Sequence, residues 1–384
     1  MKHWIVLLVP FILCACVSAP PIPKTTEFFH DYLFSKTTDP IRIEDVFSVS
    51  QEMKDYLRSD IAPQLKSKGH QQGLYDALYN KHQLKLEYDS VMTKNAAQTF
   101  HTKTGNCLSL AIMTAAFAKN LGLGVEFQSV VVDETWSRSG NLYINSGHVN
   151  IVLGKRDLYF SVSSTGEQSF IIDFQPQGEI GRQHTHLLSE KTILAMYLNN
   201  RAVELLMQGS LDEAYWAARQ AITQDVNFIS SYNTLAVIYK KHNNPQEAQQ
   251  VLSFALQFDS ENTVVISNLI QILEEVGQRD EARILATKLE KLQPYPPFYF
   301  FKLGQEAMLR QDYIGAKKLF SKEVARDAYY HEFHFWLAQA YFQLGELKNA
   351  GDQLTLAQEN SASESERNLY NAKLNKLKML QARQ

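Results

Sequence analysis

Apolar residues recur every three or four positions over most of the chain, which predicts helices from residue 27 to about residue 95 and again from residue 195 onward. Residues 107–121 form a continuous run of small and apolar residues, which predicts one buried helix. Residues 136–145 are expected to form an exposed loop. Short apolar runs bounded by glycine and asparagine are typical of β-strands. We expect such strands at residues 125–132, 148–152, 157–162 and 168–174. The chain therefore divides into a mixed α+β part and an all-helical part.

The all-helical part repeats every 34 residues. An alanine recurs at Ala214, Ala248, Ala282, Ala316 and Ala350. A turn residue recurs with it at Gly209, Asn243, Gly277, Gln311 and Gly345. A fixed 34-residue period, with alanine where two helices touch, is typical of tetratricopeptide repeats. The pattern predicts five repeats at residues 195–363, which form an all-α solenoid, and a capping helix at residues 364–384.

A stack of such helix pairs presents a concave surface that suits a protein or peptide partner. Polar and aromatic residues of the first helices are candidates to line it, and the alternative is that they are packing or solvated positions. The candidates are Asn199, Asn200, Tyr232, Asn233 and Asn268.

The first 15 residues have the features of a signal peptide, with a cationic start and a short apolar run. Residues 13–16 (LCAC) resemble the box of bacterial lipoproteins, in which the last cysteine, here Cys16, is acylated. Residues 16–26 would be the tether. The alternative is a plain secretory signal cut after Ala15 or Ala19. Since Val17 follows the cysteine rather than aspartate, we expect a lipid anchor in the outer membrane, with the protein facing the periplasm.

Composition narrows the classes of partner and of chemistry. The chain has 384 residues, of which 45% are hydrophobic, and its net charge is −3. It has no basic patch, so nucleic-acid binding is not expected. Of its three cysteines, Cys14 would leave with the signal and Cys16 would be acylated, so Cys107 would be the sole remaining thiol. An odd cysteine in an exported chain indicates a reactive thiol or an intermolecular disulfide, and the alternative is a buried, inert cysteine.

Cys107 comes two residues after Gly105, where a loop enters the predicted buried helix. The unpaired N–H groups and the dipole of a helix start favour a thiolate there and can hold an oxyanion. Two later segments each place one polar residue in an apolar run: His148 in GHVNIV and Asp173 in FIIDF. In a Cys–His–Asp site, Cys107 would attack a carbonyl, His148 would take its proton and Asp173 would orient the imidazole. The alternative is that His148 and Asp173 are structural residues.

The order Cys, His, Asp, with separations of 148 − 107 = 41 and 173 − 148 = 25 residues, resembles that of the transglutaminase-like superfamily. The similarity is greatest to a bacterial branch of exported proteins, in which a segment like residues 100–109 (FHTKTGNCLS) precedes tetratricopeptide repeats. The resemblance covers the chain from about residue 43 to the end of the repeats. It implies a papain/transglutaminase-like α+β domain at residues 27–190. Gln98 is the candidate for the family's upstream oxyanion side chain.

The resemblance implies a cysteine acyl-transfer enzyme, in which water or an amine resolves the thioester. The first outcome is that of a peptidase or amidase and the second is that of a cross-linking transglutaminase. The superfamily also contains inactive members, so the alternative function is a lipoprotein scaffold whose repeats recruit envelope proteins.

No cofactor or metal is expected. His184 and His186 form a His-x-His pair with no third ligand at metal spacing, and we expect this pair in the connection between the two parts.

Overall fold

The computed structural model describes residues 25–37, 39–79, 84, 86–89, 92–130, 136–139, 142–145, 148–154, 170–174, 185–361 and 364–381. The predicted signal peptide, Cys16, most of the tether, the strand expected at residues 157–162 and His184 lie outside these residues. No helix within the described ranges is long and apolar enough to cross a membrane.

The first part of the chain is mostly helical before the sheet. Its short 3-10 turns are η1 (Thr25–Phe28), η2 (Asp31–Leu33) and η3 (Ile43–Asp45). Its longer helices are α1 (Gln51–Asp55), which the single turn η4 (Tyr56–Asp60) continues, α2 (Ala62–Lys68), α3 (His70–Tyr79), α4 (Ala96–Thr102) and α5 (Cys107–Asn120). Ser50 is the N-cap residue before α1, and its hydroxyl accepts a hydrogen bond from the backbone N–H of Met53.

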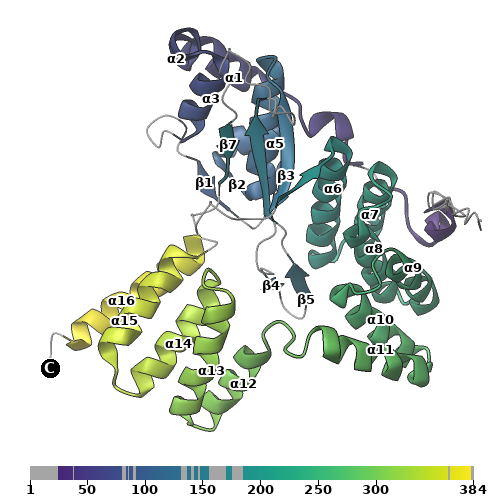
Figure 1. Cartoon of the computed structure of the whole chain (residues 1–384), viewed down its shortest axis with the longest axis vertical. Helices are drawn as coiled ribbons and strands as arrows, with labels where there is room; N and C mark the ends of the chain where they lie inside the picture. The colour runs from purple at the N-terminus through teal and green to yellow at the C-terminus, as the bar shows by residue number, and fades with distance from the viewer. Residues whose placement is uncertain are drawn as a thin grey trace, which may run out of the picture.

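The sheet has four antiparallel strands in the order β7-β6-β3-β8. They are β3 (Val125–Val130), β6 (His148–Leu153), β7 (Phe170–Ile172) and β8 (Thr185–Leu188). Helix α5 packs against this sheet (Figure 1), and a single apolar core joins Ile112 and Phe117 of α5 to Ile151 of β6. This packing sets the start of α5 beside the sheet.

Two further strand pairs lie outside the sheet. The strands β1 (Glu87–Tyr88) and β2 (Thr104–Gly105) pair in parallel. The strands β4 (Trp136–Ser139) and β5 (Leu142–Asn145) pair antiparallel. The expectation of a loop at residues 136–145 was therefore wrong. Tryptophan, tyrosine and isoleucine favour strands on both sides of the Gly140-Asn141 pair, a hairpin signal that the polar residues around them obscured.

The rest of the chain is a solenoid of helix pairs, as the 34-residue period predicts. The pairs are α6 (Glu190–Met207) with α7 (Leu211–Gln224), α8 (Ile229–Lys241) with α9 (Pro245–Phe258), α10 (Thr263–Glu275) with α11 (Arg279–Leu292), α12 (Tyr299–Leu309) with α13 (Tyr313–Arg326), and α14 (His331–Gln343) with α15 (Leu347–Glu359). Helix α16 (Glu364–Gln381) packs on α15 at the end of the stack. In Figure 1 the solenoid runs from α6, beside the sheet, down to α11 and then turns back through α12 to α16, so that it forms an open arc.

The repeated positions explain why each pair closes. All five alanines of the 34-residue series are at most 3% exposed. All five turn positions have positive φ, including Asn243 at 65° and Gln311 at 60°, where the other repeats have glycine. The left-handed conformation ends the first helix of each pair at the same point, and glycine adopts it without steric cost.

In the fourth repeat, Glu323 stands seven residues after the repeated alanine, where the first, second and fifth repeats have a second alanine (Ala221, Ala255 and Ala357). The Glu323 side chain is only 2% exposed, and its Oε1 accepts hydrogen bonds from the backbone N–H groups of Phe300 (2.8 Å) and Phe301 (3.2 Å). The carboxylate therefore caps the first turn of α12, and Arg326 pairs with it. The unusual residue at this position is a helix cap supplied by the neighbouring helix.

Residues 25–37, of which 25–26 were expected in the tether and 27–37 at the start of the α+β domain, pack on the first two repeats. The Asp31 carboxylate accepts hydrogen bonds from the Tyr215 hydroxyl (2.6 Å) and from Arg219 Nε (2.9 Å), and Trp216 donates to the Ser35 carbonyl (2.6 Å). The Phe34 ring stacks on Tyr215 at 4.0 Å. Figure 1 draws this purple segment along the outer side of α7 and α9. The N-terminal strap, as we call residues 25–37, thus belongs to the repeat core.

Candidate functional site

Cys107 is the first residue of α5 and is half-buried. Asn106 caps the helix, because its Oδ1 accepts hydrogen bonds from the backbone N–H of Ser109 (2.9 Å) and from the Ser109 hydroxyl (2.8 Å). A Cβ at Gly105 would lie only 2.8 Å from the Ser109 Cβ, so the tight entry to the helix requires glycine. The sequence signal of Gly-x-Cys at a helix start therefore has a steric cause here.

Tyr88 lies beside this helix start, and no pattern in the sequence singled it out. The pairing of β1 with β2 sets Tyr88 opposite Gly105, two residues before the thiol. Although the residue as a whole is 39% exposed, desolvation of the Tyr88 hydroxyl and the nearby Cys107 and Asp89 raise its pKa. Lys94 holds strand β2, because its Nζ donates to Thr104 Oγ1 (2.5 Å) and to the Thr104 carbonyl (3.2 Å).

His148 and Asp173 lie together in the structure. His148 begins β6 and is 3% exposed, and Asp173 directly follows β7, the neighbouring strand. The antiparallel register pairs Ile151 with Ile172, which brings the two side chains to adjacent positions. The Nε2 atom of His148 lies 2.8 Å from both carboxylate oxygens of Asp173. The Asp173 carboxylate thus accepts the Nε2–H and holds the ring in one tautomer.

The charge on this imidazole is stabilised although the ring is buried. Burial alone would lower the pKa of His148, but the hydrogen bond to Asp173 and the neighbouring Cys107 outweigh it and raise the pKa to about 9. Nδ1, the other ring nitrogen, is buried, and among the described residues none meets it with ordinary hydrogen-bond geometry. Cys107 acts on the ring through its charge and through a side-chain interaction, and both raise the pKa of His148.

A buried amide side chain lies next to this pair. Asn150 is two residues after His148 on β6, is 5% exposed, and its Oδ1 has no hydrogen-bond partner among the described residues. It pairs in register with Gln128 of β3, which is also buried. Asn150 was visible in the apolar run GHVNIV, but its burial beside His148 follows only from the strand register.

The five candidate partner residues of the repeats fall into three environments. Asn199 is buried, and the Asn200 amide donates to Thr93 Oγ1 at 3.3 Å. Tyr232 has no exposed surface and donates to the Val226 carbonyl at 2.8 Å, so it is a core residue. Asn233 and Asn268 are partly exposed on neighbouring first helices, and Asn268 Nδ2 donates to Asn233 Oδ1 at 2.7 Å.

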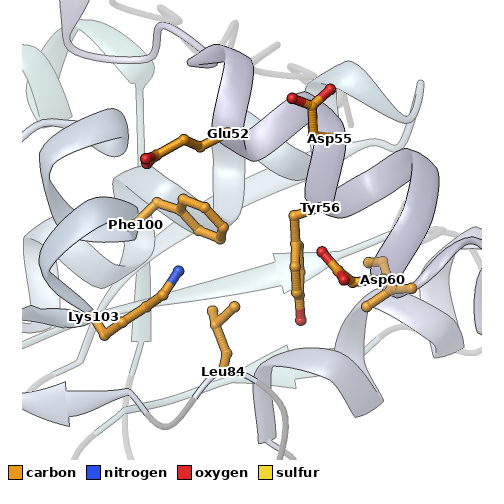
Figure 2. Close-up of a pocket in the computed structure, with 8 residues that line it drawn as sticks. Glu52, Asp55, Tyr56, Asp60, Leu84, Phe100 and Lys103 are labelled. Atoms are coloured by element: carbon orange, nitrogen blue, oxygen red, sulfur yellow. The ribbon is translucent and has the colours of Figure 1, made fainter.

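A separate hollow of about 620 Å³ lies beside α4, where apolar side chains, among them Phe100, form the floor (Figure 2). Glu52, Asp55 and Asp60 stand around it, and the Lys103 ammonium lies 3.2 Å from the centre of the Phe100 ring. Burial lowers the pKa of Lys103. The residues that line this hollow include none of the three predicted catalytic residues.

The structure also places two other residues that the sequence analysis named, His186 and Gln98. His186 lies in β8 opposite Ser129 of β3, so it is part of the sheet directly before α6 rather than of a free connection. Gln98 forms a capping box with Asn95 at the start of α4, in which its Oε1 accepts from the Asn95 N–H at 3.1 Å. Its amide oxygen is thus engaged at a helix end.

No protein-family model matches the chain, and no curated protein matches it. Several solved structures are similar to part of the chain, and PilF, YrrB and MamA are three of them. PilF of Pseudomonas aeruginosa is 20% identical over 49% of this chain and 86% of its own, with a TM-score of 0.29. YrrB, described as a TPR protein with an unusual peptide-binding site, is 18% identical over 47% and 92%, with a TM-score of 0.26. MamA is 16% identical over 41% and 93%, with a TM-score of 0.24.

Proposed function

We propose that this chain is a protein-binding repeat protein whose first part carries a cysteine acyl-transfer site of the papain/transglutaminase-like type. The observation that carries the chemistry is the His148–Asp173 pair, in which both carboxylate oxygens lie 2.8 Å from Nε2. Because Nε2 keeps its proton, Nδ1 is the nitrogen left to accept one from the thiol. Such a pair beside a thiol at a helix start supports nucleophilic catalysis.

In the proposed reaction, His148 Nδ1 takes the proton of Cys107, and the sulfur attacks the carbonyl carbon of an amide. A C–S bond forms, the carbonyl π electrons move to oxygen, and the intermediate collapses with cleavage of the C–N bond. The His148 cation returns its proton to the leaving amine, and Asp173 stabilises that cation throughout. Water then hydrolyses the thioester, or a second amine accepts the acyl group. The first outcome makes the protein a peptidase or amidase, and the second makes it a transglutaminase.

The repeats would bind the protein or peptide partner. The solenoid buries the alanine-lined contact within each helix pair and leaves polar side chains of successive first helices in a row. Asn233 and Asn268 are the two partly exposed candidates whose side chains lie next to each other, at 2.7 Å. Amide side chains donate to and accept from a peptide backbone, so a protein or peptide ligand suits this row. The LCAC sequence supports an outer-membrane lipid anchor on Cys16, and no nucleic-acid partner is proposed.

A catalytically inactive scaffold with the same repeats is the second candidate. The observation in its favour is that the buried Nδ1 of His148 has no hydrogen bond of ordinary geometry to any described residue. A catalytic thiol contact is often loose before substrate binds, so this geometry is compatible with catalysis as well.

Alkylation of Cys107 by iodoacetamide in the folded protein, followed by mass spectrometry, tests the site. We expect fast modification near neutral pH, and we expect His148→Ala to slow it at least tenfold by removing the cation that pairs with the thiolate. Asp173→Asn should slow it less and leave the fold intact. If Cys107 reacts only after unfolding, and His148→Ala changes nothing, the scaffold is the correct function.

A further inference from the structure

Thr93 lies between the start of α5 and the first repeat helix, α6, and touches both. Its hydroxyl oxygen accepts a hydrogen bond from the Asn106 amide at 2.9 Å and another from the Asn200 amide at 3.3 Å. Its backbone N–H donates to Glu204 Oε1 at 2.6 Å. Thr93 is only 2% exposed, so no water competes for these three bonds.

Two of the three hydrogen bonds join Thr93 to α6, and the third joins it to Asn106, the residue before Cys107. Asn200 and Glu204 are one helical turn apart, so both face the same side of α6. Asn106 caps α5 with its Oδ1 and is anchored to Thr93 by its Nδ2, so both ends of its side chain are fixed. Cys107 is the next residue.

A second bond reinforces this junction. The residue after Thr93, Lys94, donates its backbone N–H to the Ser109 hydroxyl at 2.9 Å, and that hydroxyl donates to Asn106 Oδ1. The segment at Thr93 and Lys94 therefore holds the first turn of α5 from outside at two points. Arg201 pairs with the other oxygen of Glu204, so this half-buried carboxylate is ion-paired as well as hydrogen-bonded.

We propose that Thr93 is a positioning residue for Cys107, and that Asn200 and Glu204 of the first repeat complete the thiol site through it. This inference rests on the proposed function of Cys107. The orientation of a nucleophile relative to its base is sensitive to small displacements, and a misplacement of about 1 Å can cost on the order of 100-fold in rate. Release of the Asn106 amide frees the cap that fixes the first residue of α5. The first tetratricopeptide repeat is thus part of the chemical site as well as of the binding surface.

The test is the rate of Cys107 alkylation by iodoacetamide in the folded full-length chain, measured against pH. Thr93→Val has nearly the same shape but cannot accept the two amide hydrogen bonds, and Thr93→Ser keeps the hydroxyl. We expect Thr93→Val to slow alkylation about tenfold, because the loss of both hydrogen bonds releases the Asn106 cap that positions Cys107. Thr93→Ser should retain the wild-type rate and pH profile, and Asn200→Ala should lie between the two.

Leu206→Ala is the control for a merely structural effect. Leu206 is buried in the repeat core on the same helix, so this change lowers the melting temperature without touching Thr93. The proposal is overturned if Thr93→Val alkylates at the wild-type rate, or if Leu206→Ala slows alkylation as much as Thr93→Val does. A wild-type rate in His148→Ala, together with slow reaction of Thr93→Val, would reject the proposed catalytic pair while keeping Thr93 as a positioning residue.

Discussion

The buried His148–Asp173 pair predicts a specific dependence of stability on pH. The pKa of His148 rises from 6.5 to about 9 in the folded chain, because the contacts with Asp173 and Cys107 outweigh burial. A raised pKa means that the folded state binds the proton more tightly than the unfolded state. The resulting stability is fully present below about pH 6.5 and is lost as the pH rises through about 9.

The magnitude follows from the same two values. One pKa unit corresponds to about 1.4 kcal/mol, so the change from 6.5 to about 9 predicts roughly 3 kcal/mol of stabilisation at acidic to neutral pH. Most of it disappears between pH 6.5 and 9. The pKa values of Tyr56 and Tyr239 are each raised to about 12. These two tyrosines change the stability only above pH 10, where unfolded tyrosine titrates, and so do not contribute between pH 6.5 and 9.

Urea unfolding of the first part of the chain, monitored between pH 6 and 9.5, measures this effect. Asp173→Asn removes the charge but keeps the shape, so its stability should vary with pH by at least 1 kcal/mol less than that of the wild type over the same window. The comparison of the two curves cancels the contributions of all other groups. Parallel curves for wild type and Asp173→Asn would refute the assignment of this carboxylate as the partner of His148.

Three further predictions concern the repeats and the anchor. Ala248→Phe should overpack the contact between α8 and α9 and destabilise the solenoid by roughly 1–3 kcal/mol in thermal unfolding, and unchanged stability would place this alanine away from its partner helix. Gln311→Gly should stabilise by about 0.5–1 kcal/mol because it relieves a positive φ, whereas Gly209→Ala, with open space around it, should destabilise by about 1 kcal/mol. Cys16→Ala should move the mature protein from the membrane fraction to the soluble periplasm, and persistent membrane fractionation would reject the lipid anchor.

The repeats could be predicted in detail because a solenoid is built from local contacts. One alanine and one turn residue per 34 positions define where each helix pair touches and where its first helix ends, and the structure confirms both features. Even the exceptions follow the rule, since Asn243 and Gln311 adopt the same left-handed conformation as the glycines. Glu323 could not be interpreted from sequence, because its role depends on two backbone N–H groups of the preceding helix.

The candidate site was only partly visible for the same physical reason. Cys107, His148 and Asp173 could be selected because each interrupts or begins an apolar run. Tyr88 and Thr93 could not be selected, because both lie in short segments without hydrophobic periodicity. A two-residue strand pair brings Tyr88 to the thiol, and a hydrogen bond from α6 helps to hold Thr93. The N-terminal strap was likewise assigned to the wrong neighbour, since its contacts with Tyr215 and Trp216 span more than 180 residues. The transglutaminase-like resemblance and the lipid anchor stay predictions.

The most direct test of the central proposal is whether Cys107 becomes acylated. p-Nitrophenyl acetate gives a coloured product when a thiol takes its acetyl group, and rapid mixing resolves a burst if the thioester hydrolyses slowly. We predict a burst that approaches one equivalent per chain, an acetyl group on Cys107 by mass spectrometry, and a burst rate at least tenfold lower in His148→Ala. Cys107→Ser should abolish the burst. Equal, slow release from wild type, His148→Ala and Cys107→Ser would contradict the proposal that this thiol is a nucleophile.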